Sequence, residues 1–102
     1  MLDKRVFYID GQWQAPAIAN DFEVINPSNE DPCAVISLGG QADTNAAVSA
    51  AKVSFDAWRE TSKKERLALI ENLAEIYMAR AEDMGEAISL EMGAPIAMAK
   101  AA

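Results

Sequence analysis

The chain changes its pattern within residues 34–44, whose sequence is AVISLGGQADT. The first five of these residues are mostly apolar and partly β-branched, which predicts a strand, and Gly39-Gly40 closes it. A helical spacing of apolar residues follows the two glycines. We therefore predict an α+β protein with a strand region in residues 1–40 and a helical region in residues 41–102, together one partial domain.

Two further extended segments precede this strand. Residues 6–9 (VFYI) and 12–14 (QWQ) flank Asp10-Gly11, a pair preferred in two-residue hairpin turns because both turn positions need a positive φ. Residues 22–25 (FEVI) form the second segment. It ends at Asn26-Pro27, because proline has no N–H to donate to a strand ladder.

The helical region opens with two predicted helices. The first covers about residues 42–60, with Asp43 at its start as an acceptor for free amides. The second opens with the capping-box pair Ser62 and Glu65. Apolar residues at helical spacing form one face of each helix: Val48, Ala51, Phe55 and Trp58 in the first, and Leu67, Ile70, Leu73, Ala74 and Tyr77 in the second.

A third helix and the start of a fourth follow. Acidic residues favour a first helical turn, and their cluster predicts a new helix near Ala81. We expect Met84 and Ile88 to be its buried side chains. Gly93 occupies the place of a C-terminal cap, and Pro95 lies just beyond it, where the fourth pattern begins. The chain therefore carries three to four helices.

The composition excludes several classes of function. The 102 residues include 9 Lys and Arg against 16 Asp and Glu, so the net charge is −7. Without a basic stripe, neither nucleic acid nor an anionic membrane is expected as a partner. No apolar run approaches the ~20 residues that span a bilayer, and the N-terminus lacks an apolar signal core. We expect a cytoplasmic protein.

Few residues suggest chemistry. Cys33 is the only cysteine and the chain has no histidine to activate it, so we interpret it as structural rather than nucleophilic. Gly39-Gly40 before a helix indicates either a phosphate cradle or a plain turn, and it matches neither nucleotide-binding fingerprint. The acidic residues 82–91 favour a solvated helix face over a hard-cation site. The residues by themselves indicate no catalytic and no cofactor-binding residue.

The order of motifs resembles the opening of the aldehyde dehydrogenase superfamily over essentially the whole chain. The matching segments, in order, are FYIDGQW (residues 7–13), FEVINP (22–27), AVSAAKVSFDAW (47–58), ERL (65–67) and LEMGAP (90–95). Each motif is weak alone, whereas five in this order and spacing are specific.

The resemblance implies the N-terminal part of the cofactor-binding domain of an enzyme that oxidises aldehydes to acids with NAD or NADP through a cysteine thiohemiacetal. The catalytic and cofactor-binding residues of that family lie beyond position 102, and Cys33 matches none of them. The chain by itself is therefore expected to be inactive and to hold no cofactor. Its expected partner is the rest of the polypeptide or a second copy, in a homo-oligomer.

One family site maps here in part, a monovalent cation bound by backbone carbonyls and a carboxylate. The resemblance assigns these oxygens to Val24, Ile25 and Glu91. Two alternatives to the N-terminal fragment stay open. One is a stand-alone module for oligomerisation or partner binding, and the other is a helical structural domain with chance similarity.

Overall fold

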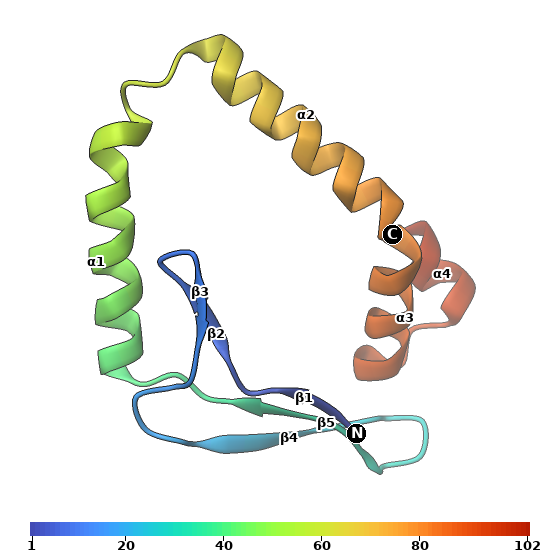
Figure 1. The fold of residues 1–102 in the computed structure, drawn as a ribbon. Coiled ribbons are helices and arrows are strands. Elements are labelled where there is room, and N and C mark those ends of the chain that lie inside the picture. The colour runs from blue at the N-terminus through green and yellow to red at the C-terminus, as the bar shows by residue number, and fades with distance from the viewer. The chain divides into compact units, whose positions relative to one another are not determined.

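The computed structural model describes residues 1–102 as five short strands followed by four helices. Their bounds, in chain order, are β1 (Leu2–Lys4), β2 (Phe7–Ile9), β3 (Gln12–Gln14), β4 (Asp21–Ile25), β5 (Pro32–Ser37), α1 (Gln41–Trp58), α2 (Lys63–Ala79), α3 (Ala81–Met92) and α4 (Ile96–Ala101) (Figure 1). The predicted α+β class is confirmed. No helix combines the length and the apolar character needed to cross a membrane.

The chain divides into two compact units. The first comprises Met1–Ile25 and Pro32–Glu60, so it holds every strand together with α1. The second comprises Asn26–Asp31 and Thr61–Ala102, so it holds α2, α3 and α4. The boundary in the helical region follows Glu60 because α1 contacts β2 of the first unit.

A three-stranded sheet organises the first unit, with β5 in its centre. β4 pairs antiparallel with β5, and β1 pairs parallel with the same strand, with Leu2 opposite Ala34 and Lys4 opposite Ile36. The sequence analysis missed β1, because three residues of which two are charged show no strand pattern. Its extended conformation depends on pairing with residues 32 positions further along the chain.

The predicted hairpin forms between β2 and β3. Asp10 and Gly11 have φ values of 54° and 74°, as the two-residue turn requires. Tyr8 lies opposite Trp13, with ring centroids 5.1 Å apart and ring planes inclined by 56°. The turn residues and this cross-strand aromatic pair therefore act together to set the register of the hairpin.

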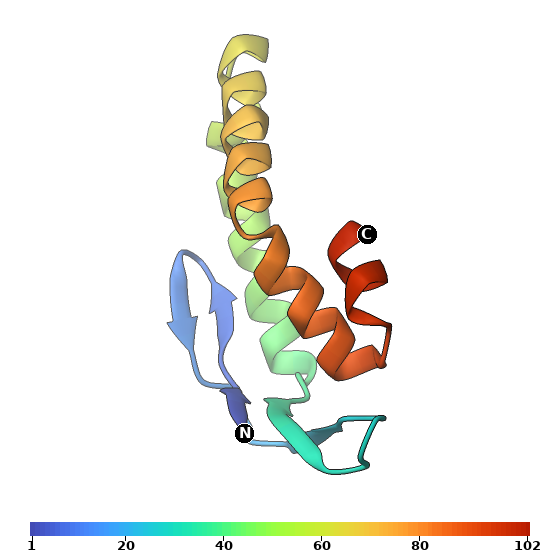
Figure 2. The same ribbon diagram turned by 90° about the vertical axis from the view of Figure 1, so that its right-hand side faces the viewer.

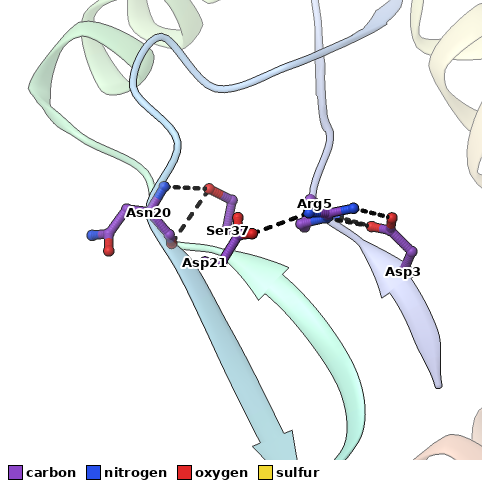
Figure 3. Close-up of polar contacts among 5 residues, drawn as sticks. All are labelled: Asp3, Arg5, Asn20, Asp21 and Ser37. Atoms are coloured by element: carbon purple, nitrogen blue, oxygen red, sulfur yellow. Dashed lines mark hydrogen bonds and ion pairs between the residues drawn. The ribbon is translucent and has the colours of Figure 1, made fainter.

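Polar side chains bind the strands of the sheet to one another (Figure 3). Arg5 donates to Asp3 at 2.7 Å and to Asp21 of β4 at 3.0 Å, and its hydrogen bonds lower the pKa of Asp3. Ser37 is the one buried polar residue. Its hydroxyl accepts from the Asn20 amide at 3.3 Å and donates to the Asn20 carbonyl at 3.4 Å.

Carboxylates satisfy the free amides at the starts of α1 and α2. Asp43 lies in the first turn of α1, where its two oxygens accept from the Gly40 amide at 2.9 Å and the Ala17 amide at 2.8 Å. These bonds hold the pKa of Asp43 below its usual value. Ser62 and Glu65 bond reciprocally, at 3.1 and 2.6 Å, which confirms the predicted capping box.

In the second unit, α3 and α4 pack closely side by side (Figure 2). Gly85 is buried on α3, and a Cβ atom there would lie 2.8 Å from the Cα of Lys100. Ala99 of α4 is buried, and Lys100 reaches Glu82 and Glu86 at 3.4 and 3.8 Å. The absence of a side chain at Gly85 lets the two backbones approach.

This packing corrects one expectation. Met84 was expected to be buried, but its side chain is 46% exposed. Ile88 was also expected to be buried, and it is half-buried. The neighbouring glycine, Gly85, is the residue of α3 that is buried. A periodicity count treats glycine as neutral and Met84 as core, so it does not identify Gly85 as the buried residue of α3.

Gly93 ends α3 in the left-handed region, with a φ of 75°. Its amide donates to the Ser89 carbonyl at 3.0 Å. A Cβ atom at this position would lie 2.8 Å from Cγ of Pro27, in the turn formed by Asn26–Asp31. Glycine is therefore needed here for two reasons, the backbone conformation and the approach of a rigid proline ring.

Alanine substitutions at Gly93 and Gly11 separate the cost of the left-handed backbone conformation from the cost of the contact with Pro27. Gly11 has nearly the same φ, 74°, but nothing lies within 4 Å of the atom that alanine would add. Gly11→Ala should lower the free energy of unfolding by about 1–2 kcal/mol, the cost of a left-handed residue with a Cβ. Gly93→Ala should cost about 1–3 kcal/mol more because of overpacking against Pro27. Urea unfolding followed by circular dichroism measures both, and equal losses would contradict the contact.

Asp43 should make stability depend on pH. Its pKa is lowered in the folded state, so its contribution is complete above the unfolded pKa, about 4, and is lost as the pH falls through the folded pKa. Asp43→Asn should be less stable than the wild type at pH 7, since an amide has one acceptor oxygen for two amides, and the difference should shrink below pH 4. Asp56→Asn, on the exposed far end of α1, is the control. A pH-independent deficit would contradict this origin.

Candidate functional site

The two carbonyl groups assigned to a cation lie in β4, next to an irregular point of the sheet. Val24 pairs with Ala34 and Ile25 pairs with Pro32, so Cys33 is the extra residue of a β-bulge on β5. The half-buried thiol of Cys33 donates to the Val24 carbonyl at 3.3 Å. The structure thus gives this cysteine a role in the sheet, as a weak donor to a backbone carbonyl of the neighbouring strand.

Glu91 lies in the last turn of α3, in the second unit, and its side chain is exposed. Two residues later Gly93 meets Pro27, which itself follows Ile25 by two residues. Val24 and Ile25 therefore lie in the first unit and Glu91 lies in the second. No group of three or more Cys, Asp or Glu side chains is arranged to hold a metal ion.

The start of α1 does not fit a dinucleotide phosphate. A phosphate on a helix N-terminus needs free amides and a positive local field. Here the Asp43 carboxylate already accepts from the Gly40 amide at 2.9 Å, and its negative charge repels a second anion. Gly39-Gly40 therefore forms the strand-to-helix turn, the plainer of the two interpretations.

The apolar side of α2 is exposed along the whole helix. No residue of this helix is buried. At 100° per residue its large apolar side chains cover an arc of about 200°, against the roughly 100° stripe of an ordinary surface helix. These side chains, 48–71% exposed, are Leu67, Leu69, Ile70, Leu73, Ile76, Tyr77 and Met78.

The sequence analysis identified only part of this arc. Leu67, Ile70, Leu73 and Tyr77 were predicted as one face, whereas Leu69 and Ile76 extend it on the other side. A one-stripe template omits the extra positions. A helical wheel drawn over the whole of α2 would have found them. α1 is similar, since none of its residues is buried and Phe55 and Trp58 are 56% and 44% exposed.

Comparisons with known proteins show the family of this chain. The model of the aldehyde dehydrogenase family matches residues 13–102. A 3-succinoylsemialdehyde-pyridine dehydrogenase from a Pseudomonas species is 45% identical over 96 residues, which are 94% of this chain and 20% of that protein. The chain therefore spans about a fifth of the length of this curated relative.

Solved structures give the same result. An aldehyde dehydrogenase from Bartonella henselae is 52% identical, with a TM-score of 0.98 over all of this chain and 21% of its own. Aldehyde dehydrogenase C from Pseudomonas syringae, a mutant solved with NAD+ and octanal, is 41% identical, with a TM-score of 0.93 over 96% of this chain and 20% of its own. The matches fall in the N-terminal region of these enzymes. The order of motifs, the fold and the family model all agree, and the chain belongs to the aldehyde dehydrogenase family.

Proposed function

We propose that this chain is the N-terminal part of an NAD(P)-dependent aldehyde dehydrogenase and supplies packing surface rather than catalytic groups. The observation that supports this most directly is the uncovered apolar arc of α2. Seven large side chains stand about half exposed there. Complete burial of each is worth roughly 1.5–3 kcal/mol, so covering the remaining half of all seven would contribute about 5–10 kcal/mol.

The width of the apolar arc of α2 favours packing against several elements of a larger protein. One neighbouring helix covers a stripe of roughly 100°, so an arc of about 200° needs neighbours on two sides. A helix that is apolar over so much of its circumference belongs in the interior of a larger protein. The relatives, of which this chain spans about a fifth, have polypeptide enough to supply such neighbours.

The cofactor belongs to the whole enzyme in this proposal. NAD+ is bound in several of the related structures, and it supplies a hydride acceptor for aldehyde oxidation; NADP fits the family resemblance equally well. In this proposal the chain contributes no residue to the cofactor site. The start of α1, which follows Gly39-Gly40, carries the Asp43 carboxylate, and this carboxylate already accepts from the Gly40 amide. The enzyme would be a cytoplasmic homo-oligomer.

We also propose that Val24, Ile25 and Glu91 supply oxygen atoms to a monovalent cation in the whole enzyme. Carbonyl and carboxylate oxygens are the donors that hard cations prefer. The Val24 carbonyl accepts a weak hydrogen bond from the Cys33 thiol, and a carbonyl oxygen has a second lone pair. The chemistry of the donors therefore fits such an ion.

The exposed apolar side chains of α2 also favour a second function, which is self-association of the chain as a stand-alone module. An apolar patch of this size is unusual on a monomer. A two-fold dimer is the commonest way to cover it. The two functions differ in which polypeptide covers α2, so a graft into a related enzyme distinguishes them.

A chimera tests the enzyme proposal. This chain replaces the matching N-terminal segment of the Bartonella henselae enzyme, and aldehyde-dependent reduction of NAD is measured. We expect activity of the same order as that of the unaltered enzyme. Leu73→Glu with Ile76→Glu should abolish it, since each buried unpaired carboxylate costs several kcal/mol. Glu71→Lys with Glu75→Lys, on the polar side of α2, should leave it unchanged. A soluble, folded but inactive chimera would refute the proposal.

The chain by itself should not bind the cofactor. Titration calorimetry of the 102-residue chain with NAD+ or NADP+ should show no heat of binding up to millimolar cofactor. The reason is that the Asp43 carboxylate occupies the start of α1, where a phosphate would need free amides. Asp43→Asn removes the repelling charge, but its side-chain oxygen can still accept from the Gly40 amide, so it too should show no binding. Micromolar affinity for either dinucleotide would contradict the assignment of cofactor binding to the rest of the enzyme.

A further inference from the structure

A hollow of about 320 Å³ lies within the first unit, between the β2–β3 hairpin and α1. The two elements contact each other, and the hairpin stands beside the helix (Figure 1). The hairpin contributes residues 8–11 to the hollow, and α1 contributes small side chains of one helix face, Ala47, Ala50, Ala51 and Ser54. This hollow is separate from the apolar arc of α2, which belongs to the second unit.

Asp10 gives this hollow a negative charge that nothing in the chain compensates. Most carboxylates of the first unit pair with an arginine or accept from backbone amides: Asp3, Asp21, Asp43, Asp56 and Glu60. Asp10 and Glu23 are the carboxylates of this unit that do neither, and of the two only Asp10 lines the hollow. No lysine or arginine is among the lining residues. The tight turn holds Asp10 at a φ of 54°, so its carboxylate is presented from a defined backbone conformation.

Two further groups of the hollow suit a cation. Tyr8 supplies an aromatic ring, which is 62% exposed and is held by its contact with Trp13 on the neighbouring strand. Aromatic rings attract cations that lie over their faces. The Ser54 hydroxyl makes no hydrogen bond in the chain, so it is free to accept one. An aromatic ring, a carboxylate and a hydroxyl acceptor together favour a cation that also donates hydrogen bonds.

The guanidinium group of arginine matches this set better than an ammonium group does. It is planar and stacks on aromatic rings, and its five N–H groups can reach a carboxylate and a hydroxyl at the same time. The hollow is open, since both Tyr8 and Asp10 are exposed, whereas sites for free small ligands bury most of the ligand surface. A side chain carried by a docked segment needs less burial, because its tether raises its effective concentration.

We propose that the hollow between the β2–β3 hairpin and α1 receives an arginine side chain from the remainder of the enzyme. The guanidinium contacts the Tyr8 ring, the Asp10 carboxylate and the Ser54 hydroxyl. This inference rests on the proposed function, and it names the chemistry of one contact outside the α2 arc. The relatives, of which this chain spans about a fifth, have the polypeptide to supply that arginine.

A titration of the full 102-residue chain tests the chemistry of the hollow. The probe is N-acetyl-arginine methylamide, followed through the NMR signals of Gly11, Ser54 and the Tyr8 ring. We expect saturable shifts with a dissociation constant on the order of 10 mM, because exposed contacts are individually weak. The matching citrulline derivative, which is neutral, should cause no saturable shift. Asp10→Asn keeps a favoured turn residue and should weaken arginine binding by about threefold or more. Glu23→Gln makes the same change of net charge outside the hollow and should leave the binding unchanged.

Urea unfolding of the chimera with the Bartonella henselae enzyme tests the source of the cation. Asp10→Asn should lower the unfolding midpoint of the chimera by about 0.3 M or more, and it should leave the midpoint of the isolated chain unchanged, because Asp10 has no partner there. Equal shifts in the two proteins overturn the inference, and so does a citrulline derivative or an Asp10→Asn chain that binds as well as the reference. Micromolar affinity for the arginine derivative also overturns it, since that indicates a site for a free cation. An inactive chimera contradicts the enzyme proposal alone, because neither the titration nor the unfolding midpoint measures activity.

Discussion

Large apolar side chains of a helix are stabilised by burial against neighbouring elements, and in this chain almost none of them is buried. Ala99 is the one hydrophobic residue that is buried, and neither α1 nor α2 buries a single residue. The hairpin turn and the helix caps are specified locally, and β1 depends on its pairing with the distant strand β5, while the large apolar side chains of α1 and α2 stay exposed.

The polar contacts determine geometry more than stability. Arg5 with its two carboxylates and the carboxylate caps of α1 and α2 all involve exposed groups, and polar contacts of exposed groups contribute little to stability. Their value lies in direction, since each bond needs a particular strand pairing or helix start. This combination of well-defined elements and little burial is what a packing segment of a larger enzyme requires.

The site illustrates what kinds of residue a sequence can reveal. Cys33 was interpreted as structural because the chain has no histidine to activate it, and the structure gives it a hydrogen bond at a bulge. The bulge itself has no signal in the sequence apart from Pro32 beside the cysteine. The arc of α2 could have been read completely from the helical wheel, because an arc depends on spacing alone. Its exposure could not, because exposure depends on what packs against it.

The sequence by itself determined the features that depend on neighbouring residues: the Asp10-Gly11 turn, the Ser62–Glu65 cap, the restart at Ala81 and the end of α3 at Gly93. Short-range hydrogen bonds and allowed φ values decide all of these. Only the tertiary structure decided that β1 pairs with β5, that Gly85 rather than Met84 meets α4, and that Pro27 lies against Gly93. Those contacts join residues far apart in the chain, so their free energy appears only when the backbones approach, and no local pattern records it.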